Sequence, residues 1–557
     1  MPNRRITIIL NANQQRRITV LIPLPPTTTT TTFGVGAGDG DEAGGSYSMK
    51  EHILTHARNK FHNKYLSRVY LWGGDELSDD DILSEKEEEV LVSKGEAYIG
   101  PPKARTRQDG RVGQVIVLAN HSFVHEDAIK QLNAVAGLEG VHAAIGMPDL
   151  HKGDRFPIGC AIIAEGIYPA LIGSDIGCGI SLYPLGPKPS HLTPEKLGSR
   201  LKNLDDPWEG DVKAWLRLYG IERETEFDAS SLGTVGAGNH FAEVLSVDRI
   251  VDAEACESLG IEEKNLYLLA HTGSRGLGAS ILRQYTRSDG NPYLPVTHPE
   301  YRTYLDQHDH AVLWAKANRD LLAHRFKTCV FGSRGSLGTA TTATAATEDD
   351  EDEDEDEDED VDTPDETHTN DADPETGATE EGGNDGDYAR AKSDLQKILD
   401  VTHNSVSPSG IADDVNGGAT KDVWIHRKGA APSDQGFVPC PGSRGDFSWI
   451  LQPMGDGERN VTKSLFFTAH SLAHGAGRLH PRNAPQLRKG GSVNQLTTTS
   501  MGSYVVCTDP DLLVQERPEA YKSVQAVVDD MEEFGIAEGV AVLRPFVTFK
   551  TGAERRK

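Results

Sequence analysis

LLAHTGSRGLG, residues 268–278, joins an apolar, strand-like run to a glycine-rich loop, with His271 at the junction. Glycine-rich loops let the backbone come close to a ligand, so the end of such a run is a favourable place for a site. His240 in GTVGAGNHFAEV and His403 in VTHNSV also lie at the ends of apolar runs. One histidine of this kind is more often a core or surface residue than a ligand. Three of them together predict a site built at the mouth of a fold.

The chain around these motifs predicts an α+β fold with three unequal parts. Residues 1–75 contain a hairpin, a helix and a strand, the order of a small β-grasp-like module. A strand–helix–strand arrangement packed on the main body would give the same pattern. Residues 76–110 turn to Asp, Glu, Lys, Gly and Pro and predict a linker. Residues 111–557 are dense in strand-like and helix-like runs and predict a catalytic domain.

One segment of the predicted catalytic domain cannot belong to a packed core. Residues 341–387 contain 23 Asp or Glu and no Lys or Arg, so they account for most of the formal net charge of −29. Such a run repels itself and has little apolar surface to bury, and we expect a disordered acidic insertion over 341–390. A docking role for a basic protein partner is the functional alternative. The rest of the surface has an ordinary charge, which leaves a polyanionic substrate open.

Cysteine usage and hydropathy indicate the compartment. The six cysteines are scattered and form no CxxC pair, which argues against a disulfide framework and a zinc ribbon. The N-terminal apolar run is too short for the core of a signal peptide, and no segment approaches the roughly 18–20 apolar residues that span a bilayer. We therefore expect a cytoplasmic or nuclear protein with no membrane partner.

Two further loops carry candidate metal donors. GSDIGCGI adds Asp175 and Cys178, and GMPDLHKGDRFPIG adds Asp149 and His151. The Asp-x-x-Cys spacing is weak alone, because a buried structural cysteine is commoner. With the three histidines, Asp175 and Cys178 would make five donors drawn from distant segments. This mixture suits Zn²⁺, Mn²⁺ or Fe²⁺ better than Ca²⁺ or Mg²⁺.

Basic residues in or next to glycine-containing turns indicate a phosphate-containing substrate. They are Arg275, Arg427, Lys428, Arg444 and Arg478. Arginine and backbone N–H groups in such turns can hold phosphate oxygens, although any one of these residues could be a solvated surface charge. SLAHGAGRLH, residues 471–480, places His474 before three small residues, and a solvent-facing turn is the simplest interpretation of that stretch alone.

Eight ordered motifs resemble the RtcB family of GTP- and manganese-dependent RNA ligases: PDLHKG, DIGCG, GNHFAE, HTGSRGLG, HN, HRKGAAP, PGSRGDFS and HGAGR. The resemblance covers about residues 100–557 and implies an RtcB-like catalytic domain with a central mixed sheet. It implies an enzyme that joins RNA 3′-phosphate or 2′,3′-cyclic phosphate ends to 5′-hydroxyl ends, in tRNA splicing or RNA repair. The implied reaction uses GTP and two Mn²⁺ ions and passes through a histidine–GMP intermediate.

The same resemblance implies a role for each site residue. His474 matches the guanylylated nucleophile, and its small neighbours would leave room for a nucleotide. The implied metal ligands are Asp175, Cys178, His240, His271 and His403, with Cys178 able to bridge two ions. The implied nucleotide-binding residues are Asn239, Glu243, Pro441, Gly442, Ser443, Ser448, Gly475, Ala476, Gly477 and Lys550.

The chain departs from the main branch of that family at Ile180–Ser181, Arg444 and Pro481–Arg482. Its PDLHKG motif is closer to the branch coupled to peptide-chain release factor H. These departures concern the choice of substrate more than guanylylation. The alternatives are a metal-dependent phosphohydrolase and a non-ligating RNA-binding paralogue. The presence of His474, Glu243, Ser448 and Lys550 favours the ligase, because hydrolysis would need no guanine pocket.

Overall fold

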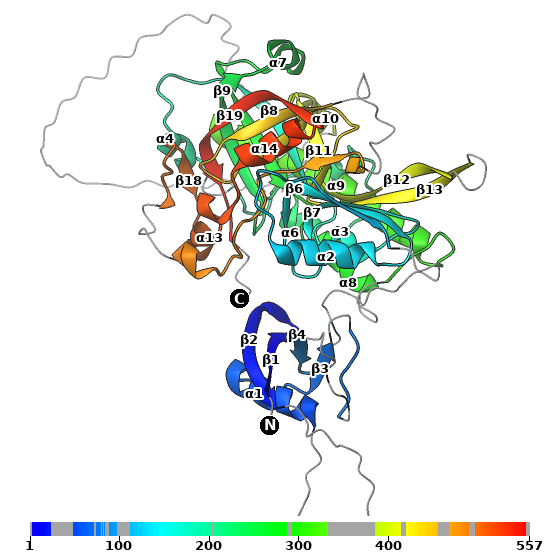
Figure 1. The fold of residues 1–557 in the computed structure, drawn as a ribbon. Helices are drawn as coiled ribbons and strands as arrows, with labels where there is room; N and C mark the ends of the chain where they lie inside the picture. The colour runs from blue at the N-terminus through cyan, green and yellow to red at the C-terminus, as the bar shows by residue number, and fades with distance from the viewer. Residues whose placement is uncertain are drawn as a thin grey trace, which may run out of the picture.

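A computed structural model shows an N-terminal module next to a larger body (Figure 1). The structure describes residues 3–552 except 24–47, 72–73, 80, 82, 84–88, 97, 99–111, 202–203, 287–291, 332–384, 414–418, 455–466 and 489–495. Most of the predicted acidic insertion therefore lies outside the described residues. In the part of the chain that is described, no helix is long and apolar enough to cross a membrane.

Four strands and one helix form the N-terminal module. The strands are β1 (Asn3–Leu10), β2 (Asn13–Pro23), β3 (Arg68–Leu71) and β4 (Glu89–Ser93), and the helix is α1 (Met49–Phe61). The strand order is β2-β1-β4-β3, with β1 and β4 parallel and the other pairs antiparallel. Ile6 and Ile8 face α1, whose Ile53 and Leu54 complete a small core. A hairpin, a covering helix and a parallel central pair make the module β-grasp-like, as expected.

This module extends further along the chain than predicted. β4 lies inside the range 76–110 that composition assigned to a linker. Val90 and Val92 are buried in the module, and β4 pairs with both β1 and β3. The linker assignment is therefore wrong over 89–93, because a charged run in front of EVLVS hid a short central strand.

The body contains all the remaining elements. Its α-helices are α2 (Glu126–Ala136), α3 (Pro169–Ile172), α4 (Pro194–Ser199), α5 (Val212–Arg217), α6 (Asp228–Ser231), α7 (Ala253–Leu259), α8 (Gly276–Tyr285), α9 (Tyr301–Phe331), α10 (Asp385–Ser393), α13 (Pro510–Gln515) and α14 (Val524–Glu533). Short 3₁₀ turns are η2 (Pro485–Arg488) and η3 (Pro518–Ala520). Its strands are β5 (Gln114–Val117), β6 (Val141–His151), β7 (Ile158–Ala164), β8 (Gly179–Pro187), β9 (Phe241–Ile250), β10 (Asn265–Thr272), β11 (Leu399–Thr402), β12 (Asn404–Asp413), β13 (Ala419–Lys428), β14 (Ala430–Pro432), β15 (Val438–Pro441), β16 (Ser448–Pro453), β17 (Ser471–Ala473), β18 (Tyr504–Val506) and β19 (Ala537–Phe549).

Two large sheets share one core. The larger has the order β11-β8-β10-β9-β19-β16-β15, with β18 beside β19, and the smaller has the order β12-β13-β7-β6-β5. Ile145 and Ile163 of the smaller sheet meet Leu451 and Val542 of the larger one. Leu472 of β17 belongs to the same core, so the segment that follows it starts from a fixed position. The predicted α+β fold with a central mixed sheet is confirmed.

The predicted insertion ends earlier than composition indicated. We expected disorder over 341–390, but α10 begins at Asp385. The ring of Tyr388 packs edge-on against Trp208 and Trp215, and its hydroxyl accepts a hydrogen bond from the backbone N–H of Asp211. The expectation is therefore wrong over 385–390, where one aromatic side chain anchors a segment of polar composition.

Candidate functional site

The five predicted metal donors lie at one end of the larger sheet. Cys178 stands immediately before β8, and His240 stands immediately before β9. His271 is the penultimate residue of β10, His403 separates β11 from β12, and Asp175 lies in the turn that leads to Cys178. Because β8 pairs with β10 and β11, and β10 pairs with β9, these strand ends meet.

The donor atoms converge around the Cys178 thiol. Its Sγ lies 3.4 Å from Nε2 of His240 and 3.4 Å from Nε2 of His271. Nε2 of His271 is 3.3 Å from Nε2 of His403, and Nε2 of His240 is 2.6 Å from Oδ2 of Asp175. The atoms form two groups of three, each within 4.8 Å, and Cys178 belongs to both. Each group could hold a divalent cation, and the Cys178 sulfur could donate in either of them.

Burial favours the neutral form of three of these donors, His271, His403 and Cys178. It lowers the pKa of His271 and His403 well below the usual histidine value, so both imidazoles are neutral. Burial also raises the pKa of Cys178, and the Asp175 carboxylate raises it further. A bound cation would release the thiol proton. Oδ1 of Asp175 is buried without a hydrogen-bond partner among the described residues. Imidazole, thiolate and carboxylate donors together fit a divalent transition metal.

Replacing Cys178 with serine will weaken metal binding more than it weakens folding. Serine nearly preserves the side-chain volume but is a poorer donor, so we expect the affinity for Mn²⁺ to fall about tenfold or more. Cys256→Ser is the matched control, because Cys256 is also buried and its thiol faces the backbone carbonyl of Val540. The measurements are metal content at a defined free Mn²⁺ concentration and the melting temperature of the metal-free proteins. Equal metal content in both variants and wild type would make Cys178 a core cysteine.

A buried arginine in α9 holds two of these strand ends together. Arg319 is completely buried and donates hydrogen bonds to the backbone carbonyls of Gly177 and Thr272. It also forms a 2.8 Å ion pair with Asp400 of β11, which pairs with Ser181 of β8. No sequence motif assigned this role to Arg319. The sequence did hold a signal, the polar triplet NRD at residues 318–320 inside an otherwise apolar part of a helical run. An arginine in such a place needs hydrogen-bond partners, because arginine is rarely buried without them.

His474 lies directly beside the donor cluster. Its ring centroid is 4.5 Å from that of His403, and its Nδ1 is 2.6 Å from Oδ2 of the buried Asp149. Gly477 has a φ of 68°, and a Cβ at this position would lie 2.3 Å from the backbone oxygen of Asp149. Only glycine permits that approach. The small residues after His474 thus allow a tight loop that sets the imidazole against Asp149.

The contact with Asp149 determines which imidazole nitrogen is available. An Nδ1–H that donates to the carboxylate leaves the lone pair on Nε2. Lys522 fixes the backbone around Asp149, because its Nζ donates to the carbonyls of Pro148 (2.9 Å) and Leu150 (2.8 Å). Burial lowers the pKa of Lys522 to about 8, although the Asp149 charge opposes this shift. Neither Asp149 nor Lys522 had been assigned this role from the sequence.

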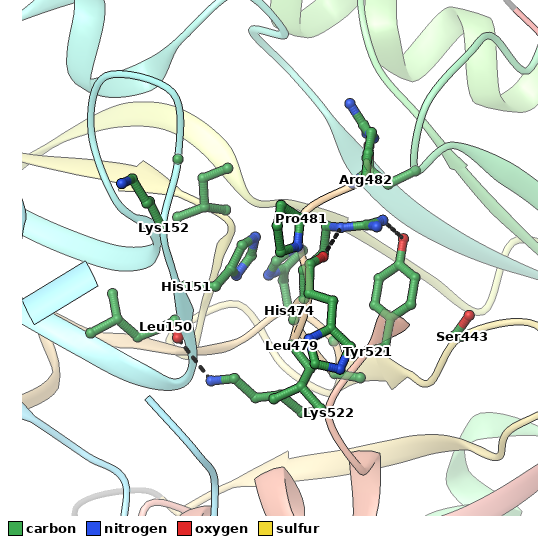
Figure 2. Close-up of a pocket in the computed structure, with 18 of the residues that line it drawn as sticks. Leu150, His151, Lys152, Ser443, His474, Leu479, Pro481, Arg482, Tyr521 and Lys522 are labelled. Carbon is green, nitrogen blue, oxygen red and sulfur yellow. Dashed lines mark hydrogen bonds between the residues drawn. The ribbon is translucent and has the colours of Figure 1, made fainter. Parts of the chain in front are cut away.

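A cavity of about 500 Å³ opens in front of His474 (Figure 2). In Figure 2, His474 lies between Lys152 on one side and Ser443 on the other. Eight of the predicted nucleotide-binding residues line the cavity: Asn239, Pro441, Gly442, Ser443, Gly475, Ala476, Gly477 and Lys550. Glu243 and Ser448 do not line it, and both are buried in strands.

Glu243 lies immediately behind the cavity wall. Its carboxyl accepts a 2.5 Å hydrogen bond from the hydroxyl of Thr548, and Thr548 lines the cavity. Burial raises the pKa of Glu243 to about 8, although the Thr548 hydrogen bond and the Lys550 charge oppose the rise. Oγ of Ser448 is buried without a hydrogen-bond partner among the described residues. The structure thus brings Glu243 to the back of the wall but does not place Ser448 on it.

A buried carboxylate that the sequence did not reveal organises the cationic part of the wall. Glu516 pairs with Arg478 (3.0 Å) and Arg482 (3.3 Å), and Nζ of Lys550 is 3.7 Å away. The hydroxyl of Tyr521 also donates to Glu516. All four partners line the cavity. Their donors are therefore held where an anionic or polar ligand could reach them. VQERPEAY shows no pattern that separates Glu516 from an ordinary surface residue.

The prediction that Arg427 binds phosphate is wrong. Its guanidinium is buried and donates to the hydroxyls of Ser471 (2.9 Å) and Ser407 (2.7 Å). It therefore links β12 and β13 to the strand that precedes His474. Of the five basic residues singled out in the sequence, Arg444 and Arg478 line the cavity.

A buried His/Cys/Asp cluster beside a large cavity with a poised histidine is typical of a metal-dependent enzyme. The sequence model of the tRNA-splicing ligase RtcB family matches residues 131–211, 209–344 and 386–551, and this chain belongs to that family. RNA-splicing ligase RtcB2 of Escherichia coli is 33% identical over 444 residues, which are 79% of this chain and 96% of the relative. tRNA-splicing ligase RtcB of Methanococcus maripaludis is 25% identical over 507 residues, covering 77% of this chain and 92% of the relative.

Proposed function

We propose that this protein is an RNA ligase that joins a 3′-phosphate or 2′,3′-cyclic phosphate end to a 5′-hydroxyl end through GMP carried on His474. The names of its relatives, RNA-splicing ligase and tRNA-splicing ligase, support RNA as the substrate. GTP is the proposed source of GMP. Two Mn²⁺ ions are the proposed cofactors, held by Asp175, Cys178 and the three clustered histidines. The reaction would serve tRNA splicing or RNA repair.

The pairing of His474 with Asp149 carries this proposal. A buried carboxylate 2.6 Å from Nδ1 keeps the imidazole in the tautomer whose Nε2 can attack phosphorus. A hydrolase that activates water at the metal cluster would have no need for a nucleophilic imidazole at the cavity. The cavity that His474 lines has room for a ligand, and eight of the residues predicted to bind nucleotide line the same cavity.

The proposed reaction has three transfers. Nε2 of His474 attacks the α-phosphorus of GTP, and the bond to pyrophosphate breaks. An oxygen of the RNA 3′-phosphate then attacks the phosphorus of the adduct, the P–N bond breaks and the imidazole is restored. The 5′-hydroxyl finally attacks the activated 3′-phosphate and releases GMP, while a cyclic end is first opened by water. Bound Mn²⁺ would neutralise charge on the reacting phosphates.

Lys550 and the Glu516 network are suited to hold the nucleotide during these transfers. Lys550 is buried, and its Nζ donates to the backbone carbonyl of His240. This bond connects the cavity wall directly to the donor cluster. We propose that Asn239 contacts phosphate, and that Glu243 and Lys550 recognise guanine. Glu243 and Ser448 could reach the base only after a local rearrangement, since neither lines the cavity.

A ligation assay with defined RNA ends tests the proposed function. RNA carrying 3′-phosphate and 5′-hydroxyl ends should be joined in the presence of GTP and Mn²⁺, and RNA carrying 3′-hydroxyl and 5′-phosphate ends should not. Replacing GTP with ATP should abolish joining. Release of inorganic phosphate from the 3′ end without any joined product would favour the phosphohydrolase instead.

Removing the acidic insertion should leave the chemistry intact. Deletion of residues 341–384 spares α10, and shortening a long loop carries little cost in loop closure. We expect the deletion variant to form protein–GMP at a rate within about twofold of wild type. A larger deletion, 341–393, removes the anchor made by Tyr388 and is the comparison. A folded 341–384 variant that fails to bind GTP would place the insertion in the active site.

A further inference from the structure

The cavity is also lined by residues to which the proposed guanylylation step assigns no role. Figure 2 shows Lys152 on the side of His474 away from Ser443. Lys152 bonds to Asp127 of α2 (2.8 Å), and several neighbours of this pair also line the cavity: Arg17, Phe123 and His125. One of them, Arg17, belongs to the N-terminal module. The two parts of the chain therefore meet at this end of the cavity.

A fixed loop presents an aromatic side chain there. The Asp530 carboxylate accepts hydrogen bonds from the backbone N–H groups of Asn120 (2.7 Å), His121 (2.6 Å) and Ser122 (2.9 Å). These bonds anchor the loop in front of α2 to α14. The next residue, Phe123, is 58% exposed and lines the cavity. An exposed aromatic ring on an immobilised loop loses little entropy when a planar group stacks on it.

Arg17 adds a cation from the N-terminal module. Val20 of the same strand packs in the core under α1, and the alternation of β2 puts Arg17 on the other face of the sheet. Arg17 lies 3.6 Å from Glu89, but both side chains are more than a third exposed, so this pair is weak. Burial raises the pKa of Asp127, yet the Lys152 hydrogen bond and nearby charges, including Arg17, lower it overall. Arg17 is thus close to the body and free to exchange partners.

We propose that Phe123, Lys152 and Arg17 form a surface for single-stranded RNA, so that the N-terminal module helps to hold the strand whose end reacts at His474. The inference rests on the proposed function, because an RNA end must reach Nε2 of His474 while nucleotide occupies the other side. Aromatic faces stack on bases, and cations follow the phosphates. RNA fits better than a protein partner, because this surface is a wall of the cavity that leads to His474.

Two variants separate this surface from the nucleotide site. Phe123→Ala and Arg17→Glu should each weaken binding of a 3′-phosphorylated RNA oligonucleotide by about fivefold or more, measured by fluorescence anisotropy. Both should raise the KM for RNA and leave protein–GMP formation without RNA unchanged. Phe123→Trp should retain binding. Tyr65→Ala and Lys60→Glu are the matched controls, because Tyr65 is 67% exposed without lining the cavity and Lys60 lies on α1, across the sheet from Arg17.

Each outcome decides part of the proposal. Equal RNA affinity for Arg17→Glu and Lys60→Glu would overturn the role of the module, and equal affinity for Phe123→Ala and Tyr65→Ala would overturn stacking. Slower protein–GMP formation in the Phe123→Ala or Arg17→Glu variant would assign the surface to the nucleotide site. If wild type forms no protein–GMP at all, the proposed function fails, and the binding measurements still report on the RNA surface.

Discussion

Replacing His474 with alanine will abolish labelling of the protein by GTP that is radioactive at the α-phosphate. The imidazole is the only group that we propose to accept GMP, so loss of Nε2 removes the first transfer and all RNA joining that depends on it. The variant should still fold, because the side chain lies at the cavity rather than in one of the apolar cores, but its melting temperature should fall because the buried Asp149 carboxylate loses its imidazole partner. Denaturing electrophoresis after incubation with Mn²⁺ and labelled GTP gives the measurement.

His191→Ala is the control for this variant, since His191 is exposed and lies outside the cavity. The metal content of His474→Ala should match wild type, because the five proposed ligands remain. Labelling that persists at the wild-type level in the alanine variant would assign the nucleophile to another residue. Loss of metal together with labelling would show that His474 acts through the cluster instead.

Replacing Asp149 with asparagine should slow protein–GMP formation by about 10³-fold or more. An amide can donate to Nδ1 and favour the tautomer that carries its proton on Nε2, where the lone pair is needed. The same substitution in the Asp–His pair of a serine protease costs about 10⁴-fold in rate. Initial rates of labelling at saturating GTP and Mn²⁺ provide the test.

Asp154→Asn is matched to that change, because Asp154 lines the same cavity and is exposed in the same segment but has no hydrogen bond to His474 among the contacts described. We expect a rate close to wild type for this control. If Asp149→Asn also labels at the wild-type rate while its GTP affinity is unchanged, Asp149 is a structural residue. A reduced affinity for GTP without a slower saturated rate would place it in nucleotide binding.

The sequence was most informative where chemistry is concentrated in short motifs. Asp175 and Cys178 are separated by two residues, and His240 and His271 each lie at a strand end that apolar runs already marked. Strand pairing then brings such ends together, which explains why the donors could be chosen before their distances were known. His474 was assigned only through the resemblance to a known family, because its stretch alone indicates a solvent-facing turn.

Residues that act over long sequence separations could not be found in this way. Arg319 contacts Gly177 and Thr272, which belong to distant segments, and only the fold defines those contacts. Glu516 likewise gains its role from Arg478 and Arg482, which approach it in space. Composition also cannot report burial. Arg427 therefore resembled a phosphate ligand although its donors are used inside the protein.

Boundaries were predicted less well than elements, because single side chains decide them. The central strand β4 follows a run of glutamates that indicated a linker. The start of α10 depends on Tyr388, whose ring packs on two tryptophans beside a segment dominated by acidic residues and glycine. In both places a few buried side chains outweigh the average character of their neighbours.

Intact-mass measurement of the wild-type protein, followed by peptide mapping, tests the covalent intermediate most directly. After incubation with GTP and Mn²⁺ in the absence of RNA, we predict a mass increase of one guanylate. The adduct should be labile in acid, be discharged by RNA with a 3′-phosphate, and map to the peptide that contains His474. A protein that joins RNA in a parallel reaction with GTP and Mn²⁺, yet gains no such mass in the absence of RNA, would contradict the proposed mechanism, and so would a protein that carries GMP on another residue.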